Sequence, residues 1–397
     1  MTEILKVHRI GLVALLTLLV LSGGCNKYAN EKLNRDFVVS VIRSTFDALD
    51  LSVNEGQGYK YYINPDGFPT GALIAWSESY LMQAYAEMFR ATRDEYYLDK
   101  LHEHIESVMH NRDDIRGQAD YNGELVPGWG TNRYTKDGAW MVFAVHTGMI
   151  TYPMLEFVQL VRQYQIQRLE DKAATILARV RESVDWHDRQ WVLQEGGFGL
   201  YTYPEDYYRN PNYILPLNQQ AAIARSLILL WELTGEKKYF EKAKDIALAI
   251  KGSLKESEFG GYVWGVQIGP LSDTNPIEDI SHGTITIDFI RLAYERGVVF
   301  TIEDMKKLAT TIKHLLADGR AEQYIDGTGD YRYEAAAAQY ALLTPYDSQI
   351  WKLCYDLLFD LYRINVTGRY FQEDWWGTIM LGMARLAHYV ARAEDGQ

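Results

Sequence analysis

His282 lies in a stretch, Asn275–Arg291, whose residue types could carry proton transfer. A loop rich in Gly and Pro (260–274) precedes this stretch, and an apolar helical pattern follows it. Asp279 or Ser281 can cap that helix, which places His282 in its first turn. Because the helix dipole puts roughly half a positive charge at that end, we expect the imidazole to stay neutral and able to accept a proton. The alternative is a capping or packing role beside a tight turn.

A second group of polar residues lies in a long loop, at Asn132 and Arg133. Trp129, Tyr134 and Lys136 surround this pair in the sequence. An amide beside a guanidinium can hold a carboxylate, and the aromatic residues suit the face of a sugar ring. The sequence therefore indicates a substrate-binding role for Asn132, Arg133 and Trp129. A purely structural role in the loop is the other interpretation.

His146 lies about two turns into an apolar helical pattern. It could face the same site as His282, although a single histidine on an apolar helix is often a satisfied core residue. Asn218 follows Pro216 at the start of another apolar helix, where an amide must cap the helix or meet a ligand. Other predicted helix starts carry Trp76, Glu78, Tyr331, Tyr333, Glu334, Tyr370, Glu373, Asp374, Trp375 and Trp376. Each has a capping or packing alternative, but their recurrence at helix starts favours a shared site.

The elements that position these residues are helical almost throughout. Apolar helices are predicted near 72–91, 138–163, 215–233, 281–297, 333–343 and 374–392. More charged helices are predicted near 95–112, 167–187, 236–252, 302–318 and 346–363, with a further one near 33–50. Segments 92–105 and 234–247 resemble each other, which indicates a repeated helical hairpin. Six or seven hairpins closed into a ring predict an all-α (α/α) toroid, with an open helical solenoid as the alternative.

The predicted loops are unequal in length, and the long ones (113–137, 188–214, 253–280 and 319–332) all lead into apolar helices. Two of them carry Gly-Gly-aromatic strips at 196–201 and 260–265, which predict short β-hairpins. Long loops gathered on one face often carry function. The positive ends of the inner helices lie on that face too, and could attract an anionic sugar despite a net charge of −13.

Composition favours one large folded domain over residues 26–397, since no linker or low-complexity run divides them. The acidic balance argues against nucleic acid as a partner. The two cysteines are too few for a Cys-based zinc site, and no metal-ligand cluster or cofactor motif is evident. Cys354 falls in an apolar helical pattern, which predicts a core position.

Residues 1–25 have the pattern of an export signal, with a basic flank and an apolar core from Gly11 to Leu21. The sequence Leu-Ser-Gly-Gly-Cys ending at Cys25 resembles the lipobox of bacterial lipoproteins. This resemblance implies cleavage before Cys25 and lipidation of its thiol. Asn26 at the next position favours sorting of the lipoprotein to the outer membrane. The lipid anchor is the only contact with the membrane that we expect. An ordinary secretory signal or an uncleaved anchor is the alternative.

The hairpin pattern and these residues together resemble the toroidal polysaccharide lyases and the helical domain of uronyl C5-epimerases. Among lyases, the sequence looks similar to the family 38 group, which cuts alginate or glucuronan. The resemblance implies a His/Tyr pair with an Asn and an Arg near the substrate carboxylate. His282 matches the His, Asn218 or Asn132 the Asn, and Arg133 the Arg.

No motif identifies the tyrosine. Tyr331 and Tyr333 are the best placed in the sequence, followed by Tyr213 and Tyr134.

The expected reaction is β-elimination on an anionic polysaccharide, without a metal or cofactor. Three alternatives remain open from the sequence. Glycoside hydrolysis needs two carboxylates, for which Glu78, Asp279, Glu334, Glu373 and Asp374 are candidates. C5 epimerisation shares the proton abstraction, and a glycan-binding surface lipoprotein would need no catalytic group.

Overall fold

A computed structural model of the chain describes residues 35–59, 70–135, 138–204, 213–365 and 375–394. Cys25, Lys136, Glu373, Asp374 and the export signal lie outside this part of the chain. Within it, no helix is long and apolar enough to cross a membrane.

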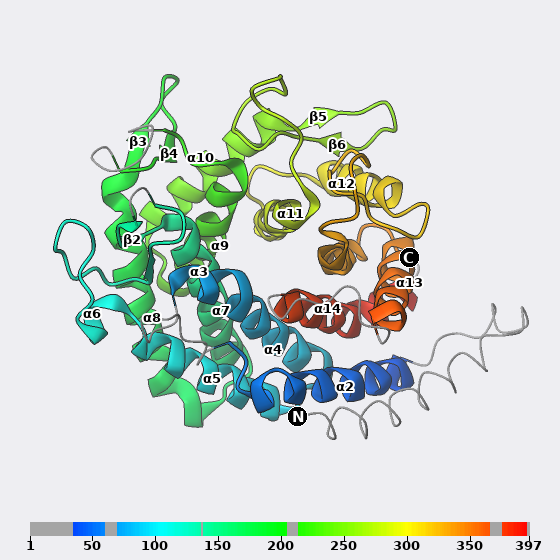
Figure 1. Cartoon of the computed structure of the whole chain (residues 1–397), viewed down its shortest axis with the longest axis horizontal. Coiled ribbons are helices and arrows are strands. Elements are labelled where there is room, and N and C mark those ends of the chain that lie inside the picture. Colours follow the sequence, from blue (N-terminus) through cyan, green and yellow to red (C-terminus); the bar gives the residue numbers. More distant parts are fainter. Residues whose placement is uncertain (1–34, 60–69, 136–137, 205–212, 366–374, 395–397) are drawn as a thin grey trace, which may run out of the picture.

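Six helical hairpins form a closed ring in the described part of the chain (Figure 1). The inner members are η2–α4 (Ile74–Glu78 and Ser79–Thr92), α7 (Ala144–Gln163), α9 (Leu217–Thr234), α11 (Ile280–Glu295), η6 (Glu334–Leu343) and α14 (Trp376–Glu394). Their outer partners are α5 (Glu95–His110), α8 (Glu170–Trp186), α10 (Lys237–Ser253), α12 (Ile302–Leu315), α13 (Gln349–Asn365) and α2 (Arg35–Ser52). The expected all-α toroid is therefore confirmed.

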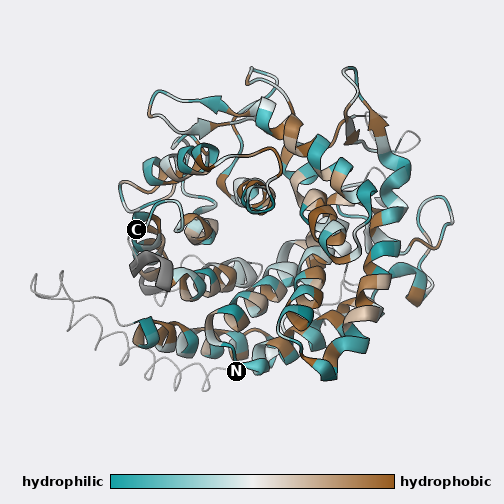
Figure 2. Ribbon diagram, turned by 180° about the vertical axis from the view of Figure 1, so that it is seen from behind, coloured by the Kyte–Doolittle hydropathy of each residue, from teal (hydrophilic) through white to brown (hydrophobic). Residues whose placement is uncertain are grey.

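The outer helices form because their sequences combine an apolar stripe with well-defined ends. Hydrophilic and hydrophobic residues alternate along them in Figure 2. Thr301 and Asp304 make a reciprocal capping box at the start of α12, and Asp94 caps α5 through the backbone N–H of Tyr96. Gly235 ends α9 in the left-handed conformation, with φ of 74°, which favours glycine. The inner helices are buried over most of their length.

The ring closes where α14 packs against both α4 and α2. A Cβ atom at Gly377, in the first turn of α14, would lie 2.4 Å from the carbonyl oxygen of Ser77. Only glycine lets the two backbones approach this closely. Cys354 is fully buried in α13, which confirms its predicted core position.

Short antiparallel hairpins lie in three of the long loops. They are β1–β2 (Gly130–Thr131 with Met141–Val142), β3–β4 (Trp191–Leu193 with Gly199–Tyr201) and β5–β6 (Lys255–Glu256 with Tyr262–Val263). The hairpins expected near 196–201 and 260–265 are confirmed. Shorter helical turns complete the elements: η1 (Asn54–Gly56), α3 (Gly71–Leu73), α6 (Asp113–Arg116), η4 (Gln167–Leu169) and η5 (His187–Gln190).

Two predicted inner helices differ from the structure. The helix expected over 138–163 begins only at Ala144, because Met141 and Val142 pair as strand β2. The segment near 333–343 is a 3₁₀ helix, η6, rather than an α-helix.

Candidate functional site

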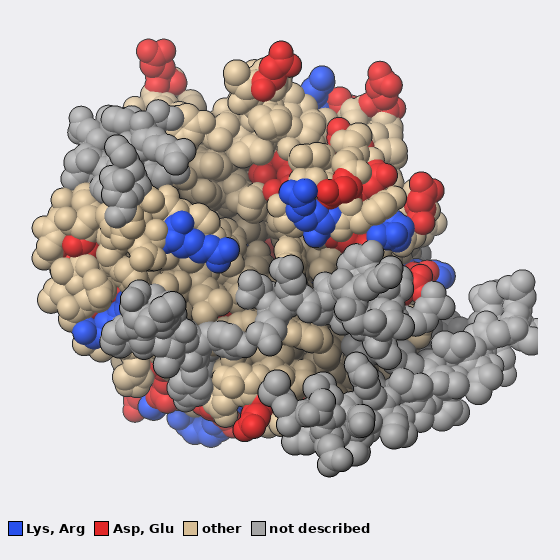
Figure 3. Space-filling view, viewed as in Figure 1, with Lys and Arg blue, Asp and Glu red and all other residues tan. Residues whose placement is uncertain are grey.

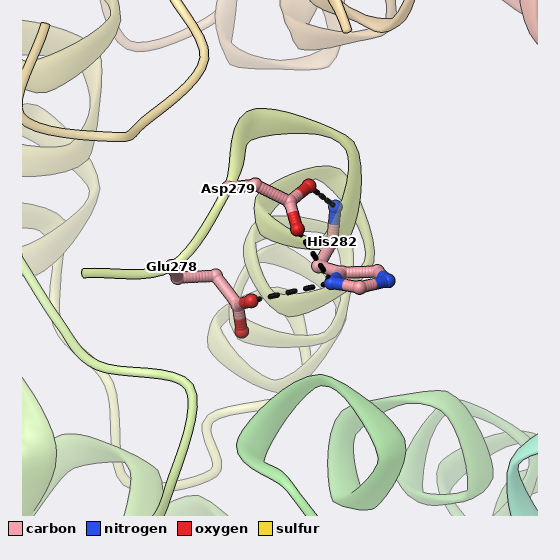
Figure 4. Close-up of side chains that lie close together, drawn as sticks. All are labelled: Glu278, Asp279 and His282. Carbon is pink, nitrogen blue, oxygen red and sulfur yellow. Dashed lines mark hydrogen bonds and ion pairs between the residues drawn. The ribbon is translucent and has the colours of Figure 1, made fainter. Parts of the chain in front are cut away.

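Three side chains meet at the start of α11: Glu278, Asp279 and His282 (Figure 4). Asp279 caps the helix, since its carboxylate accepts the backbone N–H groups of Ser281 and His282. The Nδ1 atom of His282 lies 2.7 Å from Asp279 Oδ2 and 3.4 Å from Glu278 Oε1. The other ring nitrogen points away from both carboxylates (Figure 4). With 42% of its side chain exposed, His282 is open to a ligand.

The two carboxylates set the protonation of His282. Burial lowers the pKa of His282, but its hydrogen bonds and ion pairs with Asp279 and Glu278 outweigh this effect and raise the pKa to about 10. The expectation of a neutral imidazole at position 282 was therefore wrong. The helix dipole contributes only a partial charge, whereas Asp279 and Glu278 lie within ion-pair distance. His282 is a cation at neutral pH and can donate a proton or hold an anion.

The same three side chains have the spacing of a cation site, which the sequence did not indicate. One ligand atom from each lies within 4.8 Å of the others. At neutral pH, the proton on His282 already provides positive charge between the carboxylates. A divalent ion would have to displace that proton in order to bind.

The indole of Trp76 lies close to His282 and also to a second histidine, which is on another inner helix. Its indole centroid lies 6.3 Å from that of His282 and 5.8 Å from that of His146, on α7. His146 is 1% exposed. Burial and the charge of Arg133 lower the pKa of His146 to about 3, so this imidazole is neutral. Two imidazoles on different inner helices are thus held in opposite protonation states beside one aromatic face.

The loop between α6 and β2 completes this group with Tyr134 and Arg133. The ring of Tyr134 lies 5.8 Å from that of His146, and the guanidinium of Arg133 lies 5.5 Å from the ring of Tyr134. Burial raises the pKa of Tyr134, although Arg133 and a hydrogen bond with Trp76 oppose this effect. The phenol therefore keeps its proton at neutral pH and can act as a donor.

A charged layer, formed by Arg225, Asp288 and Arg385, crosses the ring below these residues. Asp288 Oδ2 accepts hydrogen bonds from Arg225 at 3.0 Å and from Arg385 at 2.9 Å. Arg291 bonds the other oxygen of Asp288, and Gln83 on α4 lies 3.4 Å from Arg225. All members of the charged layer are buried, so the layer ties α9, α11 and α14 together and forms a floor beneath the site.

Buried polar atoms without a hydrogen-bond partner occur at several places around the centre of the ring of helices. Among the described residues, they include His146 Nδ1, the Oε2 atom of Glu278, and the Nε atoms of Arg225 and Arg385. Buried polar groups are normally satisfied by protein, ordered water or a ligand. We therefore expect water or a polar ligand to reach the centre of the ring of helices. Figure 3 shows this face hollowed near its centre, with acidic atoms inside the hollow and Lys and Arg on either side.

One residue predicted to bind substrate lies in the core, whereas two further candidates keep their expected positions. Trp129 is 1% exposed and its indole N–H donates to the carbonyl oxygen of Val108, so it is a core residue and its predicted role was wrong. Asn218 is in the first turn of α9 as expected, but it is 97% buried. Asn132 is exposed beside Arg133.

The two tyrosines favoured by the sequence lie before η6. The ring of Tyr331 packs against the guanidinium of Arg320 at 3.9 Å, and Tyr333 packs against Trp375 at 6.0 Å. Tyr134, ranked behind them, is the tyrosine that the structure brings next to a site histidine. Local sequence does not reveal this proximity, because Tyr134 and His146 approach each other only in the tertiary structure.

Two carboxylates expected at the rim are engaged in other contacts. Glu78 is fully buried and lies 2.5 Å from Nδ1 of His104, on the outer helix α5. Glu334 bonds Arg320 through both oxygens. Neither is free to act on a ligand. Sequence reasoning missed Glu278, although an acidic residue four positions before a histidine in the first turn of a helix is a recognisable signal.

Comparisons with known proteins agree with this fold. A scan against protein-family models and a search of curated proteins gave no match. Solved structures match over most of the chain. A sugar epimerase from a ruminal bacterium has a TM-score of 0.57 at 11% identity, with 89% of this chain and 98% of that chain covered.

Two further structures share the architecture. A family 76 glycoside hydrolase from a bovine Bacteroides thetaiotaomicron strain has a TM-score of 0.51 at 12% identity, covering 92% of this chain and 78% of that chain. A polysaccharide lyase has a TM-score of 0.52 at 11% identity, covering 90% of this chain and 98% of that chain. The chain thus has an (α/α)-toroid fold, which hosts different carbohydrate chemistries and does not choose among them.

Proposed function

We propose that this protein is a carbohydrate-active enzyme that abstracts a proton from carbon, and that it cleaves a uronate-containing polysaccharide such as alginate or glucuronan by β-elimination. The opposite protonation of His146 and His282, which both lie against Trp76, carries this proposal. Environments that push two pKa values apart give identical groups different roles, here a neutral base at His146 and a cation at His282. An enzyme that moves a proton at carbon needs such a pair close to one sugar ring.

Each group has a role that matches its charge. The neutral His146 takes the proton from C5 of the uronate. The C4–O4 bond breaks as the C4–C5 double bond forms, and the Tyr134 phenol donates a proton to the departing O4. Arg133 and the His282 cation hold the carboxylate, where negative charge develops in the transition state. Tyr134 thus replaces Tyr331 and Tyr333 as the proposed tyrosine, and Asn218 has no assigned role.

An anionic substrate fits the local charge of the site better than the net charge of the chain. Asp279 and Glu278 offset the charge of His282, so the positive charge at the site comes from Arg133 and from the buried charged layer, where Arg225 and Arg385 share the single carboxylate of Asp288. The acidic surplus does not oppose these cations at long range, because exposed charges further away than about 10 Å are screened by salt.

Glycoside hydrolysis has weaker support. It requires two carboxylates roughly 5–9.5 Å apart that can act on the substrate. Glu78 and Glu334 are bound to His104 and Arg320, whereas Glu278 and Asp279 share one histidine. Among the described residues, the candidates therefore reduce to one adjacent pair at His282. Glu373 and Asp374 lie outside that part of the chain.

C5 epimerisation is the second candidate. The His282 cation could return a proton to the sugar from a different side than the one His146 deprotonates. This alternative uses the same two imidazoles and omits the bond cleavage.

The test is incubation with alginate, glucuronan and glycosaminoglycans while ultraviolet absorbance is followed. Elimination produces a conjugated double bond and a rise in absorbance. New reducing ends without that rise would replace the proposal with hydrolysis. Deuterium incorporation at C5 from heavy water without cleavage would indicate epimerisation, and binding without any turnover would indicate a glycan-binding protein.

Arg133→Ala provides a matched variant for the same assay. We expect KM for the uronate polymer to rise about tenfold or more, since a charge-assisted contact contributes about 1.5–3 kcal/mol. Arg332→Ala is the control, because Arg332 is exposed and pairs with the neighbouring Asp330. Equal effects of the two substitutions would remove Arg133 from the site.

We also propose that the protein is exported and anchored by a lipid on Cys25, at the outer membrane. The support is the lipobox-like sequence around Cys25. Cells fed an alkyne-tagged fatty acid should label the wild-type protein but not the Cys25→Ala variant. Equal labelling of both would contradict the anchor.

A further inference from the structure

A buried polar chain runs from the inner helix that carries Trp76 to the outer helices. It begins at Glu78, which is fully buried and uses both carboxylate oxygens. One oxygen lies 2.5 Å from His104 Nδ1, and the other accepts the backbone N–H of Tyr59 at 2.8 Å. His104 is also fully buried. The pair lies outside the site described above, on the opposite side of the inner helix.

The chain continues from His104 towards the surface. Its Nε2 atom lies 3.4 Å from the hydroxyl of Tyr85, and that hydroxyl donates to Asp50 on α2. Lys100 lies 3.8 Å from Asp50 and also donates to the carbonyl oxygen of Gly56. Three helices, α2, α4 and α5, are thus joined through one set of polar side chains behind Glu78.

Glu78 ends the π-helical turn Ile74–Glu78, which also contains Trp76. Single π-helical turns are rare and often occur at functional sites, because the inserted residue rotates the side chains around it. Here Glu78 bonds to the outer helix α5, whereas Trp76 contacts His146 and His282 in the ring. The two side chains are two residues apart and project to opposite sides of one turn.

The loop before Tyr59 presses on the Glu78–His104 pair from outside. A Cβ atom at Gly58 would lie 2.8 Å from Glu78 Oε2 and 2.9 Å from His104 Cε1. Gly58 also has a φ of +58°, a conformation in which other residues are strained. Gly58 therefore packs closely against both Glu78 and His104 and leaves this pair little room to move.

We propose that His104 and Glu78 are positioning residues, which fix the π-helical turn and thereby hold Trp76 against the two site histidines. This inference rests on the proposed function for its effect on turnover. Its effect on Trp76 does not depend on which reaction the site performs.

The test compares His104→Gln with Tyr97→Phe. Both residues are fully buried on α5, but the Tyr97 hydroxyl donates to Asp47 on α2 at 2.7 Å, whereas His104 bonds Glu78. With the full chain and a uronate polymer, His104→Gln should lower kcat by about 100-fold, as displaced groups near a reacting centre do, and leave KM unchanged. Tyr97→Phe should lower the melting temperature and leave kcat unchanged.

The side-chain resonances of His146, assigned with a His146→Gln spectrum, give a second readout that needs no substrate. In the wild-type protein, they should not titrate between about pH 5 and 8. In the His104→Gln variant, displacement of Trp76 should let water reach His146. The His146 imidazole should then titrate within that pH range. Phe143, Tyr134 and the cation Arg133 also face this imidazole and are unchanged in the variant.

Gly58→Ala is the variant to use if His104→Gln does not fold, since it displaces the pair without removing a polar group. It should bring His146 into the same pH window. If His146 stays silent in a folded His104→Gln or Gly58→Ala protein, the positioning role is wrong. If the wild-type protein turns over no uronate polymer, the proposed function is wrong, and the resonance titration still decides the role of His104.

Discussion

Asp279 holds His282 through both the backbone and the side chain within one helical turn. Asp279 Oδ1 accepts the backbone N–H of His282 at 3.0 Å, and Asp279 Oδ2 lies 2.7 Å from Nδ1 of its imidazole. One carboxylate therefore starts α11 and also orients and charges the histidine at its tip. The start of the helix and the protonation of the site therefore both depend on Asp279.

Asp279→Asn should separate these two roles. The amide oxygen can still cap α11, but the negative charge is lost. We expect the pKa of His282 to fall from about 10 towards its ordinary value, with Glu278 as the remaining acidic partner. Titration of the His282 resonances by NMR measures this shift, and an unchanged pKa would show that Asp279 does not set the charge of His282.

The folding stability of the protein should also depend on pH through the charge of His282. The pKa of His282 is raised in the folded state, so its pairing stabilises the protein fully below about pH 6.5, the ordinary value for histidine. That contribution is lost as the pH rises to about 10. Urea unfolding should therefore show a stability loss across this window that is smaller in Asp279→Asn. Asp94→Asn is the control, because Asp94 caps α5 away from the site and should leave the pH dependence unchanged.

His282→Ala should abolish turnover while the fold remains intact. General acid–base groups contribute about 10²–10⁴-fold, so His146→Gln should also lower kcat by at least about 100-fold. His110→Ala is the matched control, since His110 is exposed at the end of α5. Steady-state assays with circular dichroism of each variant measure both effects. Near-normal activity of His282→Ala would remove His282 from the mechanism.

Asp288→Asn should destabilise the ring. The substitution leaves Arg225 and Arg385 buried without their shared carboxylate, and breaking a buried ion pair costs about 3–5 kcal/mol. Urea denaturation measures the loss. Glu106→Gln removes a surface pair with Lys172 and should cost less than about 1 kcal/mol. A similar cost for both would mean that the charged layer does not hold the inner helices together.

Trp76 and Trp129 should respond differently to truncation. Trp129→Ala removes a fully buried side chain and should cost about 3–5 kcal/mol of unfolding free energy. Trp76→Ala should act mainly on turnover, because Trp76 is only partly buried and contacts both site histidines. Parallel melting curves and kinetic assays distinguish them. A loss of stability at Trp76 equal to that at Trp129, with activity retained, would make Trp76 a core residue too.

The sequence predicted the fold well because a helical hairpin is specified by residues that lie close together in the sequence. The apolar periodicity of 215–233 and 281–297 predicted α9 and α11 to within a few residues. Capping chemistry at Asp279 placed the start of α11 and put His282 in its first turn. The late start of α7 at Ala144 was missed, because Met141 and Val142 pair with Thr131 and Gly130 of strand β1, which a local helical pattern does not encode.

The sequence alone determined the ring of hairpins, the long loops on one face and the position of His282 at a helix start, since each follows from periodicity and local caps. The tertiary structure alone decided the chemistry of the site. It reversed the expected charge of His282, because protonation depends on Glu278 and Asp279 lying within ion-pair distance of the ring. It brought Tyr134 to His146 and buried Trp129, because pKa and accessibility depend on neighbours that the chain contributes from distant segments.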